Sequence, residues 1–306
     1  MENRLSELWS IFDFLMPGFL YSYRKFRERY ELPIVKNQDP EALAALRRMT
    51  GPFVLRRLKK DVLRELPGKE ERIVYSAASG RQQKLYTASA LKLKEALAGG
   101  AWSGNGKLEV LSQLMRLRQI CCDPALCFED YTGESAKLET CVSLIASASA
   151  AGHKILLFSQ FASMLERIRE RLLQEGISSH LLVGATPKEE RSRMVQAFAS
   201  DEVPVFLISL KAGGTGLNLT AADIVIHYDP WWNVAAQNQA TDRAYRIGQE
   251  KPVTVYKLIL KDTIEENLLK LQNAKLALAA QVVSEGMVSL GDLSQNELME
   301  LFEQNP

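Results

Sequence analysis

The amino-acid sequence predicts an α/β fold, in which helices cover both faces of a parallel sheet, with an N-terminal helical appendage and a C-terminal helical extension. From residue 154 onward, short apolar runs alternate with segments of helical periodicity, which is the pattern of a parallel sheet. Before that point, apolar residues recur mainly at helical spacing. The chain has 306 residues, of which 46% are hydrophobic, so it can bury a sizeable core.

The first part of the chain is predicted to be mostly helical. Apolar residues at helical spacing between positions 5 and 15 predict a helix that Pro17-Gly18 ends. Residues 33–40 are predicted to be extended, and Asp39-Pro40 is predicted to open the next helix. Two further helices are predicted over residues 81–97 and from residue 108 to Pro124.

Five short apolar runs in the second half are predicted to be strands, and the first of them fits a strand that is buried on both faces. They cover residues 155–158, 180–183, 205–209, 224–228 and 253–259. One helix between them ends at Gly176. Thr186-Pro-Lys-Glu189 and Thr263-Ile-Glu-Glu266 match capping boxes, and they predict helices that run to Phe198 and to about residue 283. A helix that begins near Asn233 is predicted to include Arg243 and Arg246.

Charge and turn signals suggest three regions. Residues 1–70 form a helical protrusion with a basic linker, residues 71–283 form the α/β lobe, and residues 284–306 form an acidic helical extension. Residues 47–72 hold nine Lys or Arg against four acids, although the net charge of the whole chain is only +1. Such a cluster fits a polyanion site and a solvated surface equally well.

Several classes of protein are excluded by the composition. The four cysteines form no Cys-x-x-Cys pair, so we expect no metal site, and their use suits a reducing compartment. No signal peptide or membrane span is predicted, and we therefore expect an intracellular protein. The three histidines are scattered along the chain and are not expected to be catalytic.

The run Gln239-Ala-Thr-Asp-Arg-Ala-Tyr-Arg-Ile-Gly-Gln249 places Arg243 and Arg246 three residues apart. On a helix this spacing puts both guanidinium groups on one face. Arginine is always protonated and stabilises charge on a phosphoryl group in transfer. Two solvated arginines would give the same short pattern, and the run alone does not decide between the two interpretations.

A glycine-rich loop follows the predicted strand 205–209. Gly213, Gly214 and Gly216 would let backbone amides approach a phosphate, and Thr215 and Asn218 would add donors. A tight turn that needs positive φ is the alternative. A dinucleotide fingerprint is disfavoured, because the glycine order is wrong and the loop is too near the next strand for a crossover helix.

No Gly-x-x-x-x-Gly-Lys-Ser/Thr run and no Asp-Glu-x-His box occurs in the 306 residues. The chain therefore lacks the loop that cradles β- and γ-phosphates and the hydroxyl that holds Mg²⁺. Asp229 ends an apolar run, but without a P-loop beside it we interpret it as a loop or capping residue.

In this context the chain resembles the C-terminal RecA-like lobe of Swi/Snf-type DNA-dependent ATPases of helicase superfamily two, and of bacterial members in particular. The 239–249 run resembles motif VI, and the glycine-rich loop resembles motif V. The segment Lys154-Ile-Leu-Leu-Phe-Ser-Gln-Phe161 resembles motif IV. Further similar segments are Pro52–Pro67, Leu117-Arg-Gln-Ile-Cys-Cys-Asp-Pro124, Val183–Arg191 and Asp229-Pro-Trp-Trp-Asn233. The start of the chain resembles the residues after motif III, so we expect the second half of a two-lobe motor.

The resemblance implies an ATP hydrolase that acts as a double-stranded-DNA translocase. Arg243 and Arg246 would be its catalytic arginine fingers, with Arg246 the main one. Trp231-Trp232 could stack on bases, but bracing of the loop before the arginines is favoured, because a translocase on duplex DNA meets no unstacked base. The residues implied in ATP binding are Gly214, Thr215, Gly216 and Gln239, and those implied in gripping the DNA backbone are Ser159, Gln160, Thr186, Arg191, Ser209, Lys211 and Asn218.

The implied cofactor is ATP with Mg²⁺, held mainly by the missing N-terminal lobe, so this chain alone is expected to be inactive. Its implied partners are double-stranded DNA, that N-terminal RecA-like lobe and other DNA-bound or transcription proteins, with no membrane. The implied location is the bacterial cytoplasm and nucleoid, or the nucleus of a eukaryote. The alternative is a non-catalytic RecA-like module that binds DNA or protein; a Rossmann-type oxidoreductase is disfavoured by the loop.

Overall fold

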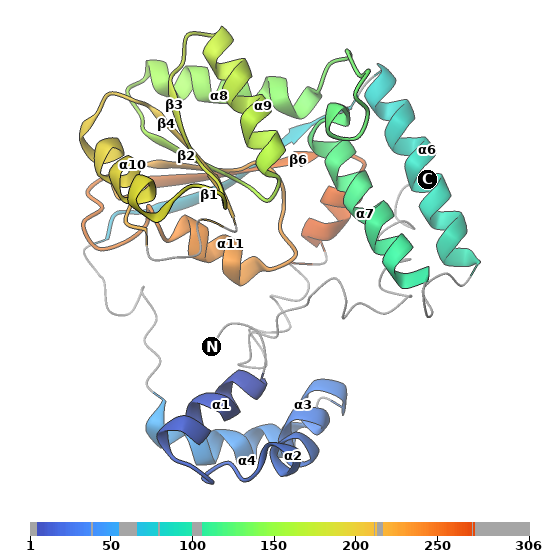
Figure 1. Cartoon of the computed structure of the whole chain (residues 1–306), viewed down its shortest axis with the longest axis vertical. Coiled ribbons are helices and arrows are strands. Elements are labelled where there is room, and N and C mark those ends of the chain that lie inside the picture. The colour runs from blue at the N-terminus through green and yellow to red at the C-terminus, as the bar shows by residue number, and fades with distance from the viewer. Residues whose placement is uncertain are drawn as a thin grey trace. The chain divides into compact units, whose positions relative to one another are not determined.

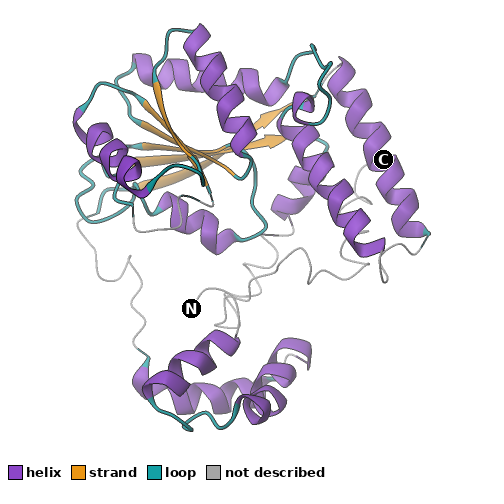
Figure 2. Cartoon of the chain, in the orientation of Figure 1, coloured by secondary structure: helices purple, strands orange, loops and turns teal. Residues whose placement is uncertain are grey.

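The computed structural model describes residues 5–37, 39–54, 66–78, 80–99, 106–210, 212, 217–270 and 272. The chain forms two compact units, which divide between residues 65 and 66. The described part of the first unit consists of helices joined by short turns, and the second contains a six-stranded sheet (Figures 1 and 2). The predicted boundaries at residues 70 and 283 stay a prediction, and residues 284–306 lie outside the described part.

The N-terminal unit packs its helices around a small apolar core. This core contains Phe12, Leu20, Phe26, Tyr30 and Leu46. As predicted, Asp39 caps a helix, because its carboxylate accepts hydrogen bonds from the amides of the first turn. The helices are α1 (Leu5–Leu15), α2 (Tyr23–Phe26), the π-helix η1 (Arg27–Glu31), α3 (Leu32–Asn37), α4 (Pro40–Thr50) and the 3₁₀ helix η2 (Gly51–Phe53).

The prediction of an extended segment over residues 33–40 is wrong, because α3 occupies most of it. The chain leaves η1 with Leu32 already in the right-handed helical conformation. Pro33 then takes the second position of α3, and its fixed φ is compatible with a helical conformation. Ile34 packs against the core of the unit and anchors the turn. Tertiary packing therefore overrides the two prolines that suggested an extended chain.

The sheet of the second unit is parallel throughout, with the strand order β1-β6-β5-β2-β4-β3. All five predicted strands are present, each within one residue of its expected ends. The sixth, β1, was not predicted, because its first five residues are exposed and its apolar run, Ile73–Tyr75, follows four charged residues. The strands are β1 (Lys69–Ser76), β2 (Ile155–Ser159), β3 (Ser179–Leu182), β4 (Val205–Ser209), β5 (Ile224–His227) and β6 (Val253–Leu260).

Helices cover both faces of this sheet, which confirms the predicted fold class. Along β2, Ile155 and Leu157 face the core that includes α8 (Ala136–Ala150) and α9 (Ala162–Gln174). The alternate residues Leu156 and Phe158 face the core that includes α10 (Lys188–Ser200) and α11 (Val234–Thr241). In Figure 1 the pair α8 and α9 lies on the opposite side of the strands from α10 and α11. Both faces of β2 are therefore buried, as its unbroken apolar run predicts.

A helical hairpin adjoins the sheet. It is made by α6 (Gly80–Ala98) and α7 (Gly106–Cys122), both predicted, and is followed by the 3₁₀ helix η3 (Pro124–Leu126). The amide of Gln82 in α6 donates to the carbonyl of Ile120 and accepts from the amide of Ala136, which ties the hairpin to the start of α8. Cys121 and Cys122, at the end of α7, are 0% exposed and pack as small apolar side chains.

The two predicted capping boxes have different outcomes. The first is wrong: α10 begins after Pro187, which provides no side-chain cap, and the Thr186 hydroxyl accepts from the amide of Val183 instead. In the second, the Thr263 hydroxyl accepts from the amide of Glu265, while the Glu266 carboxylate accepts from residue 262 rather than from residue 263. Residues 264–270 are helical, and the predicted end near residue 283 lies outside the described residues. Among the described helices, none combines the length and apolar character needed to cross a membrane.

Candidate functional site

The carboxyl ends of β2, β4 and β5 meet at one edge of the sheet. Ser159 ends β2 and pairs in register with Ser209, which ends β4. Asp229 lies two residues after β5, the neighbour of β2 on its other side. Ligands of open parallel sheets bind beyond this edge. The structure therefore brings together Ser159, Gln160 and Ser209, three residues that the sequence implies in DNA binding.

One buried carboxylate, that of Asp229, organises this edge. It accepts hydrogen bonds from the Ser159 hydroxyl at 2.5 Å and from both the backbone amide and the side-chain amide of Gln160. Ser159 and Asp229 are 0% and 1% exposed. A contact between the Ser159 hydroxyl and DNA would therefore require this bond to open. The interpretation of Asp229 as a loop residue holds, but its role is to join the ends of two strands.

Thr186, in the loop between β3 and α10, and Arg191, near the start of α10, form a second group. The Arg191 guanidinium donates to the carbonyl oxygens of Thr186 at 2.8 Å and Gly184 at 2.9 Å. It therefore holds the loop in one conformation and stays half-buried. Since parts of both residues are accessible, a backbone phosphate could reach them without unfolding the loop, and their role in DNA binding stays a prediction.

The glycine-rich loop is described only in part. Asn218 is exposed, whereas Ser209 is buried and its hydroxyl accepts from the amide of Ala212 at 3.3 Å. The predicted roles of Lys211, Gly214, Thr215 and Gly216 fall on residues that lie outside the described part of the chain.

The predicted helix through Arg243 and Arg246 is wrong, because α11 ends at Thr241. The carbonyl of Arg243, which a continuing helix would use, accepts instead from the amide of Leu219 at 3.0 Å. The amides of residues 244 and 245 both bond to the carbonyl of Thr241, which tightens the last turn. The two arginines therefore lie in a turn after α11, and residues 242–249 are called the arginine turn below. Gln239 lies on α11 and is half-buried.

The arginine turn holds one buried and one exposed guanidinium. Arg243 is 8% exposed, whereas Arg246 is exposed to solvent. Burial lowers the pKa of Arg243, and the positive charge of Arg246 lowers it further. The two charges are therefore close enough to repel each other although they do not share a helix face. A bound anion that met both groups would relieve this repulsion.

Comparison with known proteins places these features in a family. Residues 1–126 match the model of the SNF2-related domain, and residues 136–248 match that of the helicase conserved C-terminal domain. The structure of the Sulfolobus solfataricus SWI2/SNF2 ATPase C-terminal domain is 31% identical, with a TM-score of 0.63, over 78% of this chain and 100% of that one. The chain belongs to the SWI2/SNF2 ATPase family.

Two longer proteins each contain a region that is similar to this chain. The Bacillus subtilis protein that carries the name ATP-dependent helicase/translocase YwqA is 43% identical over 99% of this chain, which spans 33% of that protein. The Sulfolobus solfataricus SWI2/SNF2 ATPase core in complex with dsDNA is 35% identical, with a TM-score of 0.65, over 98% of this chain and 64% of that one. The chain thus spans about a third of the curated relative and about two thirds of the ATPase core.

Two buried residues that organise this SWI2/SNF2 lobe, Arg118 and Gln249, were not predicted. Arg118 on α7 is 1% exposed and donates to Gln160 and to the carbonyl of Pro230. Gln249, the last residue of the arginine turn, is 6% exposed and donates to the carbonyls of Thr220, Ala222 and Ala244. Arg118 lies in the segment Leu117–Pro124 and Gln249 ends the run 239–249, both of which resemble family motifs. Most of their partners are distant in sequence, so no local pattern indicates that either residue is buried.

We predict that Gln249→Ala loosens the arginine turn. Loss of the side-chain amide leaves three carbonyl acceptors that are buried or nearly so, and we expect the free energy of unfolding to fall by about 1–3 kcal/mol. Urea denaturation measures this change, with Glu250→Ala as the control, since Glu250 is adjacent and exposed. Equal stability of the two variants would contradict the prediction.

A second prediction concerns His227, which ends β5 and bonds to Thr241 at the end of α11 at 2.8 Å. Burial, followed by the charge of Lys257, lowers the pKa of His227 to about 3, against a raising effect of Glu71. In the unfolded chain the imidazole binds a proton near pH 6.5. Below that pH the unfolded state gains a proton that the folded state excludes, so stability falls as pH falls.

Because of His227, we expect the free energy of unfolding to fall by about 1.4 kcal/mol for each pH unit below the pKa of the unfolded imidazole, down to the pKa of the folded one. Urea denaturation at neutral pH and at mildly acidic pH measures it. His227→Gln cannot bind this proton, so its stability should depend less on pH over the same range. If the free energy of unfolding changed equally with pH in the two proteins, His227 would not be buried in its neutral form.

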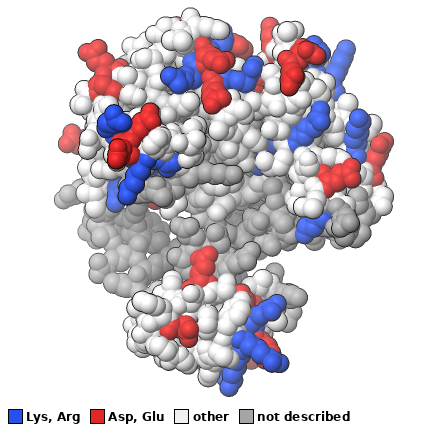
Figure 3. Space-filling model, viewed as in Figure 1, with Lys and Arg blue, Asp and Glu red and all other residues white. Residues whose placement is uncertain are grey.

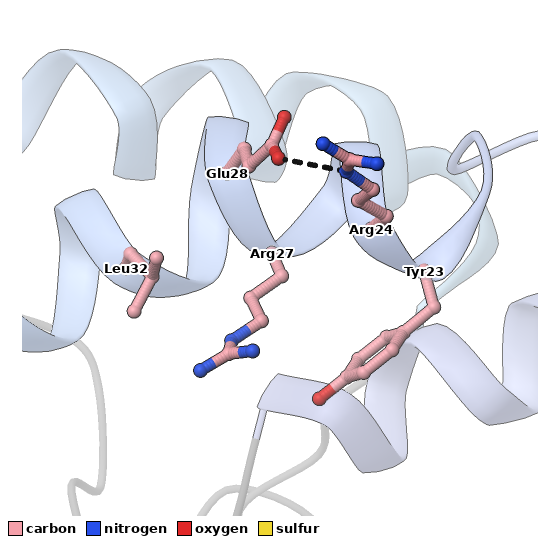
Figure 4. A pocket seen from close by; sticks show the side chains of 5 residues that line it. All are labelled: Tyr23, Arg24, Arg27, Glu28 and Leu32. Carbon is pink, nitrogen blue, oxygen red and sulfur yellow. Dashed lines mark hydrogen bonds and ion pairs between the residues drawn. The ribbon is translucent and has the colours of Figure 1, made fainter.

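The N-terminal unit carries a separate open pocket. It is lined by Tyr23, Arg24, Arg27, Glu28 and Leu32, and Arg24 pairs with Glu28 at 3.2 Å (Figure 4). Cationic side chains gather beside α2 in Figure 3, whereas acids and bases are interspersed over the visible face of the α/β unit. The pocket holds none of the residues implied in ATP or DNA binding, and the predicted basic cluster lies largely at residues 55–65, outside the described part.

Proposed function

We propose that this chain is the second, C-terminal lobe of an ATP-dependent double-stranded-DNA translocase. The observation that carries the proposal is the arginine turn, which exposes Arg246 to solvent and holds the buried Arg243 three residues before it, in a chain that has no P-loop of its own. Such a pair suits the phosphates of a nucleotide that another lobe holds. Membership of the SWI2/SNF2 ATPase family and the name of the Bacillus subtilis relative support the same assignment.

In this proposal the P-loop lobe of the same protein binds ATP and Mg²⁺, and this lobe closes over them. Arg246, the exposed member of the pair, contacts the γ-phosphate as the main finger, and Arg243 supports it. Gln239, Gly214, Thr215 and Gly216 contribute to the same nucleotide site. The residues proposed to grip the DNA backbone are Ser159, Gln160, Thr186, Arg191, Ser209, Lys211 and Asn218. The complex of the Sulfolobus solfataricus ATPase core with dsDNA supports duplex DNA as the partner.

The test is nucleotide-dependent docking of the two lobes. A P-loop lobe from a related SWI2/SNF2 ATPase is titrated into this chain with and without a non-hydrolysable ATP analogue. We expect the analogue to tighten the association and Arg246→Ala to remove that gain, while Arg193→Ala, an exposed arginine on α10, leaves it unchanged. If the affinity between the two lobes were the same with and without the analogue, the proposal would be refuted and a non-catalytic binding module would be favoured.

A further inference from the structure

Arg118 lies on α7, outside the sheet, yet its guanidinium group reaches the carboxyl edge of the strands. One terminal nitrogen donates to the side-chain oxygen of Gln160 at 2.8 Å. The other donates to the carbonyl of Pro230 at 2.5 Å and lies 3.8 Å from the carboxylate of Asp229. The rings of Phe161 and Trp232 lie within 6 Å of the guanidinium carbon. A single rigid, buried side chain therefore holds the loops that follow β2 and β5.

The loop after β2 is the side that we propose contacts DNA. Gln160 has both ends of its side-chain amide engaged, since its oxygen accepts from Arg118 and its nitrogen donates to Asp229. Asp229 in turn holds the Ser159 hydroxyl. A DNA phosphate that drew Gln160 outward would break these bonds and leave the Arg118 charge with fewer partners. A buried charge without its partners is costly, so the groups around Arg118 would have to rearrange when Gln160 moves.

The loop after β5 is the side that leads to the arginine turn. Pro230, the acceptor of Arg118, precedes Trp231, whose amide donates to the side chain of Gln237 on α11 at 3.2 Å. Asn233 caps the same helix, because its side chain accepts from the amide of Ala236 at 3.0 Å. The placement of the loop therefore sets the start of α11, and α11 ends where the arginine turn begins.

We propose that Arg118 is a positioning residue that couples DNA contact at the end of β2 to the placement of α11 and the arginine turn. The inference rests on the proposed function, because the proposed function assigns DNA contact to the loop after β2 and nucleotide contact to the arginine turn that the loop after β5 leads to. Arginine suits the task, since its planar fork offers parallel donors to two acceptors on different loops. Lysine keeps the charge but is a single point donor, so Arg118→Lys separates the loss of the fork from the loss of charge.

The kinetic test uses this chain fused to a P-loop lobe. For Arg118→Lys we expect the kcat in the presence of duplex DNA to fall about 10–100-fold, the cost of a small misplacement of groups near the reaction, while the KM for ATP changes little. Arg116→Gln is the control, because Arg116 lies on the same helix and is exposed. Leu114→Ala, a buried apolar residue of α7, controls for general destabilisation. A DNA-stimulated kcat equal to that of the wild type, or an equal loss in Leu114→Ala, would overturn the inference.

Hydrogen exchange of the 306-residue chain alone gives a readout that needs no ATPase activity. We expect faster exchange at the amides of Trp231 and of α11 in Arg118→Lys than in Arg116→Gln, with the strands β2 and β5 unchanged. Unchanged exchange at α11 overturns the inference whatever the kinetics. An inactive wild-type fusion overturns the proposed function instead, and the coupling to DNA contact falls with it.

Discussion

Arg246→Ala is expected to lower the kcat of the two-lobe fusion, measured with saturating duplex DNA, by about 10³–10⁵-fold. The guanidinium would act on charge that develops in the transition state, so the KM for ATP should change much less than kcat. The exposure of Arg246 leaves it accessible to a second lobe, and its charge already perturbs Arg243. Steady-state ATPase assays measure both constants.

Two variants sharpen this test. Arg246→Lys keeps the charge without the planar fork, and its kcat should lie between those of the wild type and Arg246→Ala. Arg193→Ala removes an exposed arginine from α10 and should leave kcat unchanged. If Arg246→Ala behaved like Arg193→Ala, the assignment of the main finger to Arg246 would be wrong.

The second large effect is on stability. Lys137 on α8 and Glu265 in the closing helix form an ion pair at 2.6 and 2.8 Å, with the two side chains 0% and 1% exposed. Lys137→Met leaves the Glu265 carboxylate buried without its cation, and we expect the free energy of unfolding to fall by about 3–5 kcal/mol. Urea denaturation at neutral pH measures this loss.

The matched control for this pair is Lys92→Met, an exposed lysine on α6, which should change stability by no more than about 0.5 kcal/mol. The double variant Lys137→Met with Glu265→Gln removes both charges, and Gln can still accept the hydrogen bond that Glu265 receives from the amide of Leu260. We expect it to regain part of the lost stability. A double variant less stable than Lys137→Met would contradict this account of the pair.

The elements that the sequence predicted well are those whose signal is local. The strands β2, β4 and β5 are buried along their whole length, so each contains an apolar run that is visible without knowledge of its neighbours. The helix α8 was not predicted, because serine and alanine separate its few large apolar residues. The edge strand β1 has only a short apolar run after four charged residues, and it pairs with β6, which is distant in sequence.

In the candidate site, too, local motifs could be predicted from the sequence, whereas contacts between distant residues could not. The arginine pair was found as a short motif, yet its helix was predicted too long, because a bond from Leu219 ends the helical pattern. Ser159 and Gln160 were found by resemblance, but their inward bonds to Asp229 and Arg118 depend on residues about 40 to 70 positions away. Sequence motifs therefore located the edge of the sheet that matters, whereas tertiary packing determines which side chains are accessible there.

The decisive measurement is ATPase activity with and without duplex DNA, for this chain alone and for its fusion to a P-loop lobe. We expect no activity for the chain alone, activity for the fusion that rises with DNA, and loss of that activity in Arg246→Ala. An inert fusion, or one that hydrolyses ATP equally well with and without DNA, would contradict the claim that this lobe completes a DNA-dependent motor.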